Sequence, residues 1–249
     1  MTTLKGKVAL ITGAGRGIGK AIAERYALLG AAVAVNYAKD EKSAAETVAA
    51  IRSGGGSAVA IQGDVSKVAD IDRLFAVTAE QLGGVDIVVA NAGVELVDQR
   101  VLEFTEADFD RLFGVNTQGA FFTLQRAAKH VRDNGRIIYV GSSTTRLPQP
   151  DYGLYAASKI APQYLVEVLA KELGHRGVTV NSILPTAIEG AGVYTTGASD
   201  RVREFVRSTR PIARMGTLHD VANAAEYFAS DLAGFVSGQH LLLSGGAPA

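Results

Sequence analysis

The stretch that decides the fold is residues 7–19, Lys7-Val8-Ala9-Leu10-Ile11-Thr12-Gly13-Ala14-Gly15-Arg16-Gly17-Ile18-Gly19. Residues 8–11 form a short, unbroken apolar run, which is typical of a parallel strand buried on both faces. Ile22, Tyr26 and Leu29 then recur at helical spacing, so we expect a helix after the glycines. Glycines allow a sharp turn and let a pyrophosphate approach the N–H groups and dipole at the helix N-terminus. Strand, turn and helix together predict a nucleotide site rather than an ordinary tight turn.

Composition limits the classes of protein that need to be considered. The chain has 249 residues, of which 47% are hydrophobic, which suits one α/β domain with a large core. Its 25 basic and 25 acidic residues balance, so neither nucleic acid nor an acidic membrane is an expected partner. The absence of cysteine excludes disulfides and a thiol nucleophile. Residues 1–6 lack a signal-peptide pattern and no stretch reaches membrane-spanning length, so we expect a cytoplasmic protein.

Strand-like and helix-like segments alternate along the whole chain without a linker or repeat. Expected strands cover residues 8–11, 32–37, 58–62, 85–90, 136–140, 178–184 and 241–243. Expected helices include residues 41–53, 66–82, 155–175 and 217–229, together with a long helix that begins at Thr105. This alternation predicts a Rossmann-type, doubly wound, seven-stranded parallel sheet with helices on both faces, in a single domain of residues 1–249.

Two helix starts and one apolar stripe give more local predictions. Ser66 is expected to cap the helix of residues 66–82, and Thr105 with Asp108 resembles a capping box. Phe109 and the apolar residues at 112 and 113 are expected to lie in the core.

Ligands of such sheets bind at the carboxyl ends of the strands, and the loops at these ends carry polar groups. They contain Asp64-Val65, Asn91-Ala92-Gly93, Ser142-Ser143 and Pro185-Thr186. Asp64 suits either helix entry or a hydrogen bond to an adenine amino group. Asn91 suits either a left-handed turn or a role in the site.

Tyr155 and Lys159 lie four residues apart on an expected helix, so they share one face. A neighbouring ammonium favours the phenolate, which would lower the pKa of the tyrosine from about 10 toward the working pH. The pair suits proton exchange, although the same spacing also suits a packed ring beside a solvated charge.

These motifs, in this order, resemble the single-domain short-chain dehydrogenase/reductases over essentially the whole chain. Thr12-Gly13-x-x-x-Gly17-x-Gly19 resembles the family's cofactor turn, Asn91-Ala92-Gly93 its sheet-stabilising motif, and Tyr155-x-x-x-Lys159 its active-site pair. Ser142 stands where the family's catalytic serine falls, with Ser143 as its rival, and Asn116 matches the asparagine of its tetrad. Within the family the chain is most similar to 3-oxoacyl-carrier-protein reductases and to bacterial carbonyl and polyhydroxynaphthalene reductases.

The resemblance implies hydride transfer between a nicotinamide and a ketone or secondary alcohol of a small molecule. Tyr155 would donate the proton to the carbonyl oxygen, Ser142 would hold that oxygen, and Lys159 would bind the ribose. Asn116 would kink its helix and hold a water near Lys159. A homotetramer through the two long helices after strands four and five is also implied. Alternatives are a 3-oxoacyl-carrier-protein reductase and a non-catalytic NADP-binding sensor; an extended epimerase would need a longer chain.

Cofactor preference follows from the end of the second strand. An NAD enzyme usually carries a carboxylate there for the ribose hydroxyls, whereas this strand ends without one. Arg16 and Lys39 offer positive charge for a 2′-phosphate, so we expect NADP, with NAD possible. The expected cofactor-binding residues are Thr12, Gly13, Arg16, Gly17, Ile18, Gly19, Asn36, Tyr37, Ala38, Lys39, Asp64, Val65, Asn91, Ala92, Gly93, Tyr155, Lys159, Pro185 and Ile188.

The segment after strand six departs from the family pattern. Thr186 replaces the usual glycine, and Gly190 replaces a threonine expected to contact phosphate. Residues 189–210 are expected to form a mobile lid over the substrate. Expected walls of the substrate site are Leu147, Tyr152, Val193 and Tyr194. The lid arginines Arg201, Arg203, Arg207 and Arg210 suit either a solvated helix face or a docking patch for an acidic carrier protein. No histidine spacing suggests a metal site.

Overall fold

The computed structural model describes residues 2–247; residue 1 and residues 248–249, the ends of the predicted domain, lie outside the described part. The strands are β1 (Val8–Ile11), β2 (Ala32–Tyr37), β3 (Ser57–Gln62), β4 (Ile87–Ala90), β5 (Arg136–Val140), β6 (Thr179–Pro185), β7 (Ile188–Glu189), β8 (Gly216–Thr217) and β9 (His240–Leu243). The α-helices are α1 (Gly17–Leu28), α2 (Glu41–Ser53), α3 (Val68–Leu82), α4 (Glu106–Leu112), α5 (Ala120–His130), α6 (Gly153–Leu173), α7 (Asp200–Thr209) and α8 (Leu218–Ala229). A π-helical segment, η2 (Phe113–Gly119), joins α4 to α5, and short 3-10 turns are η1 (Val101–Glu103), η3 (Ser143–Thr145), η4 (Gly174–Arg176), η5 (Gly192–Tyr194) and η6 (Asp231–Ala233).

Seven strands form one parallel sheet in the order β3-β2-β1-β4-β5-β6-β9. The predicted doubly wound, Rossmann-type sheet is therefore confirmed. Strand order reverses between β1 and β4, and ligands of such sheets bind beside that reversal. A separate pair, β7 with β8, was not predicted; it ties the start of the lid segment to the residues before α8.

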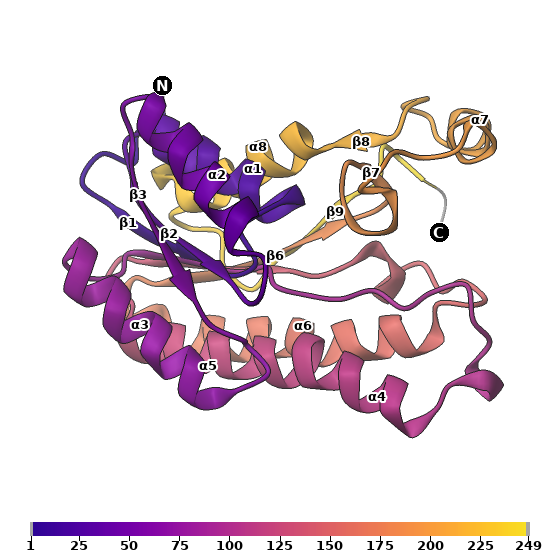
Figure 1. The fold of residues 1–249 in the computed structure, drawn as a ribbon, viewed down its shortest axis with the longest axis horizontal. Helices are drawn as coiled ribbons and strands as arrows, with labels where there is room; N and C mark the ends of the chain where they lie inside the picture. The colour runs from indigo at the N-terminus through magenta and orange to yellow at the C-terminus, as the bar shows by residue number, and fades with distance from the viewer. Residues whose placement is uncertain (1, 248–249) are drawn as a thin grey trace.

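Two helical layers cover the sheet, with α1, α2 and α8 on one face and α3, α5 and α6 on the other (Figure 1). Side chains of β1 alternate between the two cores, because successive residues of a strand point to opposite faces. Ile11 joins the core that contains Tyr26 of α1, whereas Leu10 joins the core that contains Phe75 of α3. The strand is thus buried on both sides, as its unbroken apolar run indicates.

Two local predictions were wrong. Ser66 does not cap α3, which begins at Val68 after Lys67; its hydroxyl instead donates to the carboxylate of Asp64 at 2.7 Å. The Asp64 carboxylate also accepts from the Ser66 N–H at 3.0 Å, so a local Asx turn has replaced the cap. Phe109 is 47% exposed, because α4 contacts α6 and η2 rather than the sheet.

The capping boxes that begin α4 and α8 agree with the sequence. Thr105 accepts from the N–H of Asp108, whose carboxylate accepts from Thr105 in return, and Thr217 with Asp220 repeats this exchange. Within residues 2–247, no helix combines the length and apolar character needed to span a bilayer.

Candidate active site

The glycine turn after β1 is braced from the end of β2. Gly13 and Gly17 adopt φ values of 64° and 55°, a region that favours glycine. The Asn36 side chain accepts from the Gly13 N–H at 3.1 Å, and its backbone carbonyl accepts from the Ala14 N–H at 2.8 Å. The turn is therefore held open as a preformed loop.

Asn36 is buried, and its amide nitrogen donates to the Gly63 carbonyl at 2.9 Å and the Ile61 carbonyl at 3.3 Å. Its side chain thus joins the glycine turn to the end of β3. Among the expected cofactor residues, Asn36 acts through the shape of the turn and offers a ligand only its main chain.

The start of α1 fits an anionic group. Arg16 is its N-cap residue but makes no side-chain cap, and the first turn contains no acidic residue. The helix dipole therefore faces the loop without a carboxylate of its own to neutralise it. These features fit the pyrophosphate of a dinucleotide at this helix N-terminus.

Positive charge lies where the missing carboxylate of β2 would stand. Arg16 and Lys39 are exposed at the turn and after β2. The nearby Asp40 caps α2, and hydrogen bonds from Ser43, assisted by the charge of Arg16, lower its pKa. Burial opposes ionisation of Asp64, but its hydrogen bonds with Ser66 and the charges of neighbouring lysines, including Lys39, give it a lowered pKa.

Thr12 and Asn91 join the carboxyl ends of β1 and β4. The Thr12 hydroxyl accepts from the N–H groups of Asn91 and Ala92, both at 3.0 Å. The Asn91 amide donates to the carbonyls of Thr12 and Gly13 at 2.9 and 3.2 Å. The left-handed turn considered for Asn91 is absent, since the described non-glycine residues with positive φ are Asp98, Asn134 and Asp151.

Asn116 lies in η2, where the helix widens by one residue. Its side chain accepts from the Val94 N–H at 2.8 Å and donates to the Val94 carbonyl and the Ser158 hydroxyl, both at 2.9 Å. These contacts fix the loop after β4 against α6. The predicted kink in this helix is present as a π-helical segment.

Tyr155 and Lys159 share one buried face of α6, 6% and 4% exposed. The Lys159 ammonium donates to the Val140 carbonyl at the end of β5 at 3.3 Å and lies 6.0 Å from the Tyr155 ring centroid. An added Cβ on Gly93 would lie 2.8 Å from the Lys159 nitrogen, so this glycine leaves room for the ammonium. Burial lowers the pKa of Lys159 to about 8, although the charge of Glu95 opposes the shift.

The expected lowering of the Tyr155 pKa is not what the structure shows. Burial raises the pKa of Tyr155 well above its usual value, and the charge of Glu95 raises it further. Hydrogen bonding to Ser142 acts in the opposite direction but is outweighed. Desolvation dominates because the side chain is almost fully enclosed, and burial disfavours the charged phenolate.

Ser142, rather than Ser143, lies beside the Tyr155 hydroxyl. The Ser142 hydroxyl accepts from the hydroxyl of Thr144 at 2.9 Å, so its acceptor side is occupied and its proton is free to point elsewhere. The structure therefore brings together Ser142, Tyr155 and Lys159 at the ends of β4 and β5, with Asn116 supporting the adjacent loop.

Glu95 is a site residue that the sequence analysis missed. Its carboxylate accepts from the Val193 N–H of the lid at 2.7 Å and lies near Tyr152, Tyr155 and Tyr194. The signal was its place two residues after Gly93, in a loop that follows a strand end.

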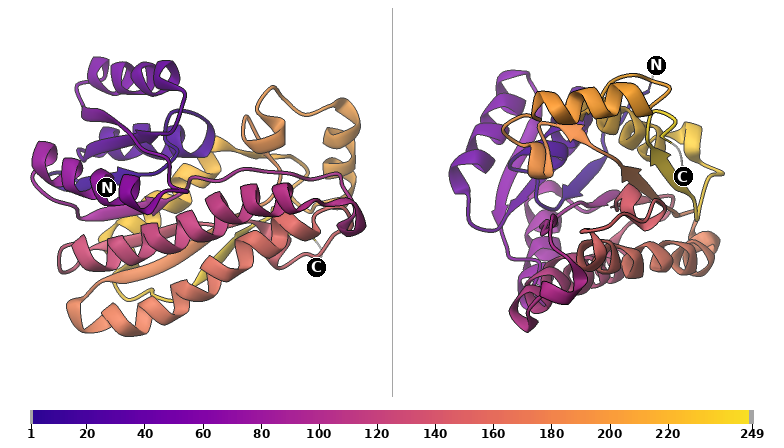
Figure 2. Two further views of the ribbon diagram at one scale, coloured as in Figure 1. Left: turned by 60° about the horizontal axis from the view of Figure 1, so that its bottom comes forward. Right: turned by 90° about the vertical axis from the view of Figure 1, so that its right-hand side faces the viewer.

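The lid segment is ordered around ion pairs. Arg203 bonds Glu189 and lies 3.6 Å from Asp200, and Arg207 lies 3.7 Å from Glu204. Two of the four arginines of the predicted basic patch are thus paired with acidic neighbours. In Figure 2 (right), α7 and the rest of the orange lid segment lie on the side of the molecule that faces the viewer.

The predicted walls Tyr152 and Tyr194 are both half-buried. Burial, together with the charges of Tyr194, Asp98 and Glu95, raises the pKa of Tyr152 to about 12. Both phenols therefore remain protonated, neutral donors near neutral pH. Val193 is 49% exposed and contributes its backbone N–H, whereas Leu147 is only partly buried.

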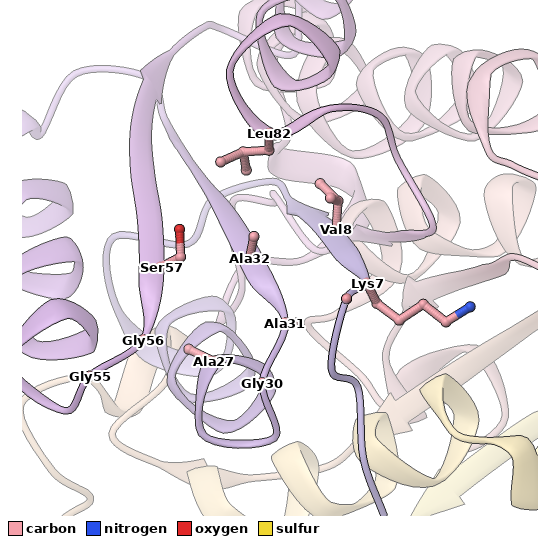
Figure 3. A pocket seen from close by; sticks show the side chains of 11 residues that line it. Lys7, Val8, Ala27, Gly30, Ala31, Ala32, Gly55, Gly56, Ser57 and Leu82 are labelled. Carbon is pink, nitrogen blue, oxygen red and sulfur yellow. The ribbon is translucent and has the colours of Figure 1, made fainter.

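A hollow of about 360 Å³ lies away from this site. Figure 3 shows it at the amino ends of β1 and β2, lined by Val8, Ala32, Ser57 and glycines, with the Lys7 side chain pointing aside. It contains no acid–base group beside a cofactor turn, so it is not the candidate active site. No group of three or more metal-ligating side chains occurs in the described part of the chain.

Comparisons with known proteins agree with this geometry. A family model described as enoyl-(acyl carrier protein) reductase matches residues 13–248. A hydroxynaphthalene reductase-like protein of Metarhizium majus is 38% identical over 258 residues, covering 98% of this chain and 96% of the relative. A solved short chain dehydrogenase from Burkholderia cenocepacia, in complex with NADP, is 36% identical, covers 99% of both chains and has a TM-score of 0.90. An angucycline C-6 ketoreductase solved with bound NADP is 36% identical, with 98% of this chain and 96% of that chain covered and a TM-score of 0.90.

Proposed function

We propose, from the premise that this chain belongs to the short-chain dehydrogenase/reductase family and is an oxidoreductase of carbonyl and alcohol groups, that it reduces a ketone with NADPH. The proposal depends on one observation: Ser142, Tyr155 and Lys159 lie together near the glycine turn. The N-terminus of α1, which suits an anionic group, lies at the same carboxyl edge of the sheet. The similar chains solved with NADP and the ketoreductase among them support the choice of cofactor and reaction.

Each residue has a chemical role in this proposal. The carbonyl carbon would receive a hydride from NADPH, and Tyr155 would pass its proton to the carbonyl oxygen. Ser142 donates a hydrogen bond to that oxygen and keeps it beside the tyrosine. Because burial keeps Tyr155 protonated, the proton donor for reduction is present throughout the neutral range.

Lys159 and Asn116 act around this pair. The Lys159 ammonium would hold the ribose hydroxyls, in place of or beside its present contact with the Val140 carbonyl. Both amide donors of Asn116 are occupied, by Val94 and Ser158, and its carbonyl oxygen keeps one acceptor position beside the Val94 N–H, so it would serve Lys159 chiefly by shaping η2. The predicted water near Lys159 would then be held by main-chain groups that the widened helix frees.

We assign the NADP preference to Arg16 and Lys39. They are exposed beside the end of β2, where a carboxylate would repel a 2′-phosphate. Arg16 is the stronger candidate, because a planar guanidinium binds phosphate bidentately and lies within the glycine turn itself. NAD would bind more weakly through the same pyrophosphate site.

The test is the loss of nicotinamide absorbance with NADPH or NADH and a panel of ketones, diketones, sugars and a 3-oxoacyl thioester. We expect turnover with NADPH on at least one ketone class. Tyr155→Phe should abolish turnover while leaving the Kd for NADPH within about twofold, because it removes one hydroxyl outside the cofactor turn. Wild-type activity in this variant would refute the assignment. Cofactor binding without turnover of any substrate would favour the non-catalytic sensor.

A 3-oxoacyl-carrier-protein reductase is the second candidate, because the matching family model is named for an acyl-carrier-protein enzyme. Two of the four lid arginines are paired with acidic side chains, which argues against a strongly basic docking patch for an acidic carrier protein. Turnover of the thioester tenfold faster than of every free ketone would favour this candidate.

A homotetramer is proposed through the helices that follow β4 and β5. Phe121 of α5, and Ile160 and Tyr164 of α6, are 41%, 52% and 70% exposed, which is unusual for large apolar side chains unless a partner covers them. Light scattering should give a mass of four chains, and a monomer would refute the assembly.

A further inference from the structure

Glu95 places a carboxylate between the loop after β4 and the lid segment. It follows the Asn91-Ala92-Gly93 turn at the end of β4 and reaches the lid, where the Val193 N–H donates to it at 2.7 Å. Gly192, with a φ of 55°, approaches the same carboxylate closely; an added Cβ would overlap both of its oxygens. The lid backbone is therefore shaped to accommodate this side chain.

The same carboxylate faces the reacting end of the site. It acts on the Tyr155 hydroxyl both through its charge and as a hydrogen-bonding neighbour, and its charge also reaches Lys159. Tyr152 and Tyr194 lie near it from the two sides of the site. The Val193 N–H and the Tyr155 hydroxyl together leave about two of the roughly four acceptor positions of the carboxylate for a substrate.

We propose that Glu95 determines substrate specificity by accepting a hydrogen bond from a hydroxyl next to the reacting carbonyl and by repelling substrates that carry a negative charge there. The inference rests on the proposed ketone reduction and names the substrate class of that site: neutral hydroxyketones, flanked by the phenols of Tyr152 and Tyr194.

The role of Glu95 explains why a carboxylate is tolerated beside Tyr155. A carboxylate that raises the pKa of the proton donor disfavours its ionisation, which would slow alcohol oxidation. A substrate hydroxyl that donates to Glu95 draws the carboxylate away from Tyr155 and leaves the phenol free to face the carbonyl. Specificity and proton transfer are thereby linked through one side chain.

The test compares Glu95→Gln with wild type on two pairs of ketones, using NADPH. The first pair is 2-hydroxyacetophenone and 2-methoxyacetophenone, which differ in the hydroxyl proton; the second is methyl benzoylformate and benzoylformate, which differ in charge. Asp110→Asn is the control, because it neutralises an exposed carboxylate of α4 that touches none of the site residues. Thermal melting shows that each variant is folded.

We expect wild type to favour the hydroxyl over the methoxy ketone, and the ester over the acid, in kcat/KM. Glu95→Gln should reduce each preference by about tenfold, the difference between a charged and a neutral hydrogen bond. Asp110→Asn should leave both ratios within about twofold of wild type. Unchanged ratios in Glu95→Gln would overturn the inference.

Binding keeps this test separate from that of the proposed function. Calorimetry of the same four compounds against the protein saturated with NADP gives the preferences without turnover. Absence of turnover with intact binding preferences would refute the ketone reductase and leave Glu95 as the selecting residue. Turnover without either preference would support the reductase and refute the role of Glu95.

Discussion

Replacing Asn36 by alanine should damage both the stability of the fold and the cofactor turn. The side chain is 1% exposed and accepts from the Gly13 N–H while donating to the carbonyl of Gly63. Removing it leaves two buried backbone groups without partners, each worth about 1–3 kcal/mol. We therefore expect a loss of about 2–5 kcal/mol in the free energy of unfolding, which lowers the Tm by roughly 5–15 °C in a chain of this size.

The second effect is on NADPH. Without the hydrogen bonds of the Asn36 side chain, the glycine turn must become ordered when NADPH binds. We therefore expect the Kd for NADPH to rise about tenfold, which is a loss of about 1.4 kcal/mol in binding free energy. Differential scanning calorimetry and fluorescence titration measure the two effects separately. Both should appear in the same variant.

Asn181→Ala is the matched control. Asn181 is also 1% exposed, and it donates to the Val236 carbonyl at 2.7 Å and accepts from the Gln239 N–H at 3.0 Å. It bridges β6 to the segment before β9, far from the glycine turn, so it should lose comparable stability and keep the NADPH Kd of wild type. If the two variants bind NADPH equally well, the bracing role of Asn36 is refuted.

Three further predictions follow from the site. Gly93→Ala should lower kcat at least tenfold and the free energy of unfolding by about 1–3 kcal/mol, because its Cβ would lie 2.8 Å from the Lys159 nitrogen and 3.2 Å from the side-chain oxygen of Asn116. Gly174→Ala, whose methyl meets nothing within 4 Å, should be silent in both assays. Burial lowers the pKa of Lys159 to about 8 from an unfolded value of 10.5, so the unfolded state binds more protons than the folded state between these pH values. The free energy of unfolding of the wild type should therefore rise with pH across this window by about 3 kcal/mol relative to that of Lys159→Met. Urea titrations of both proteins across the window measure this difference, and a constant difference would refute the prediction. Arg16→Ala should weaken NADPH about tenfold and NADH little, and equal losses for both cofactors would remove Arg16 from the 2′-phosphate site.

Strong local patterns made most of the sheet predictable. The bounds of β1, β2, β5, α2 and α8 follow the expected residues closely, because apolar runs, glycine stops and capping residues agree in these segments. The β7–β8 pair was missed because each strand has only two residues, too few for periodicity. Phe109 was misplaced because helical periodicity shows which residues share a face, but not whether that face meets the sheet.

The identity of the site residues was easier to predict than their pKa shifts and contacts. Spacing placed Tyr155 and Lys159 on one face of α6, as observed. Sequence spacing gives no measure of how deeply the two side chains are buried. Burial determines the direction of the pKa shifts of both Tyr155 and Lys159. Asn36 illustrates the same limit, since its position at a strand end suggested ligand contact while its side chain turned inward to the backbone.

Glu95 shows how a strand-end loop can combine positioning with selectivity. The loop after β4 is held from below by Asn116, which bonds both backbone groups of Val94, and from above by the contact of Glu95 with the lid. Because Asn116 fixes the backbone of this loop and the Val193 N–H holds the Glu95 carboxylate at the lid, the negative charge stays where it would repel an anionic substrate. If Glu95 selects the substrate as proposed, weakening the hydrogen bonds of Asn116 to Val94 should relax specificity before it abolishes proton transfer.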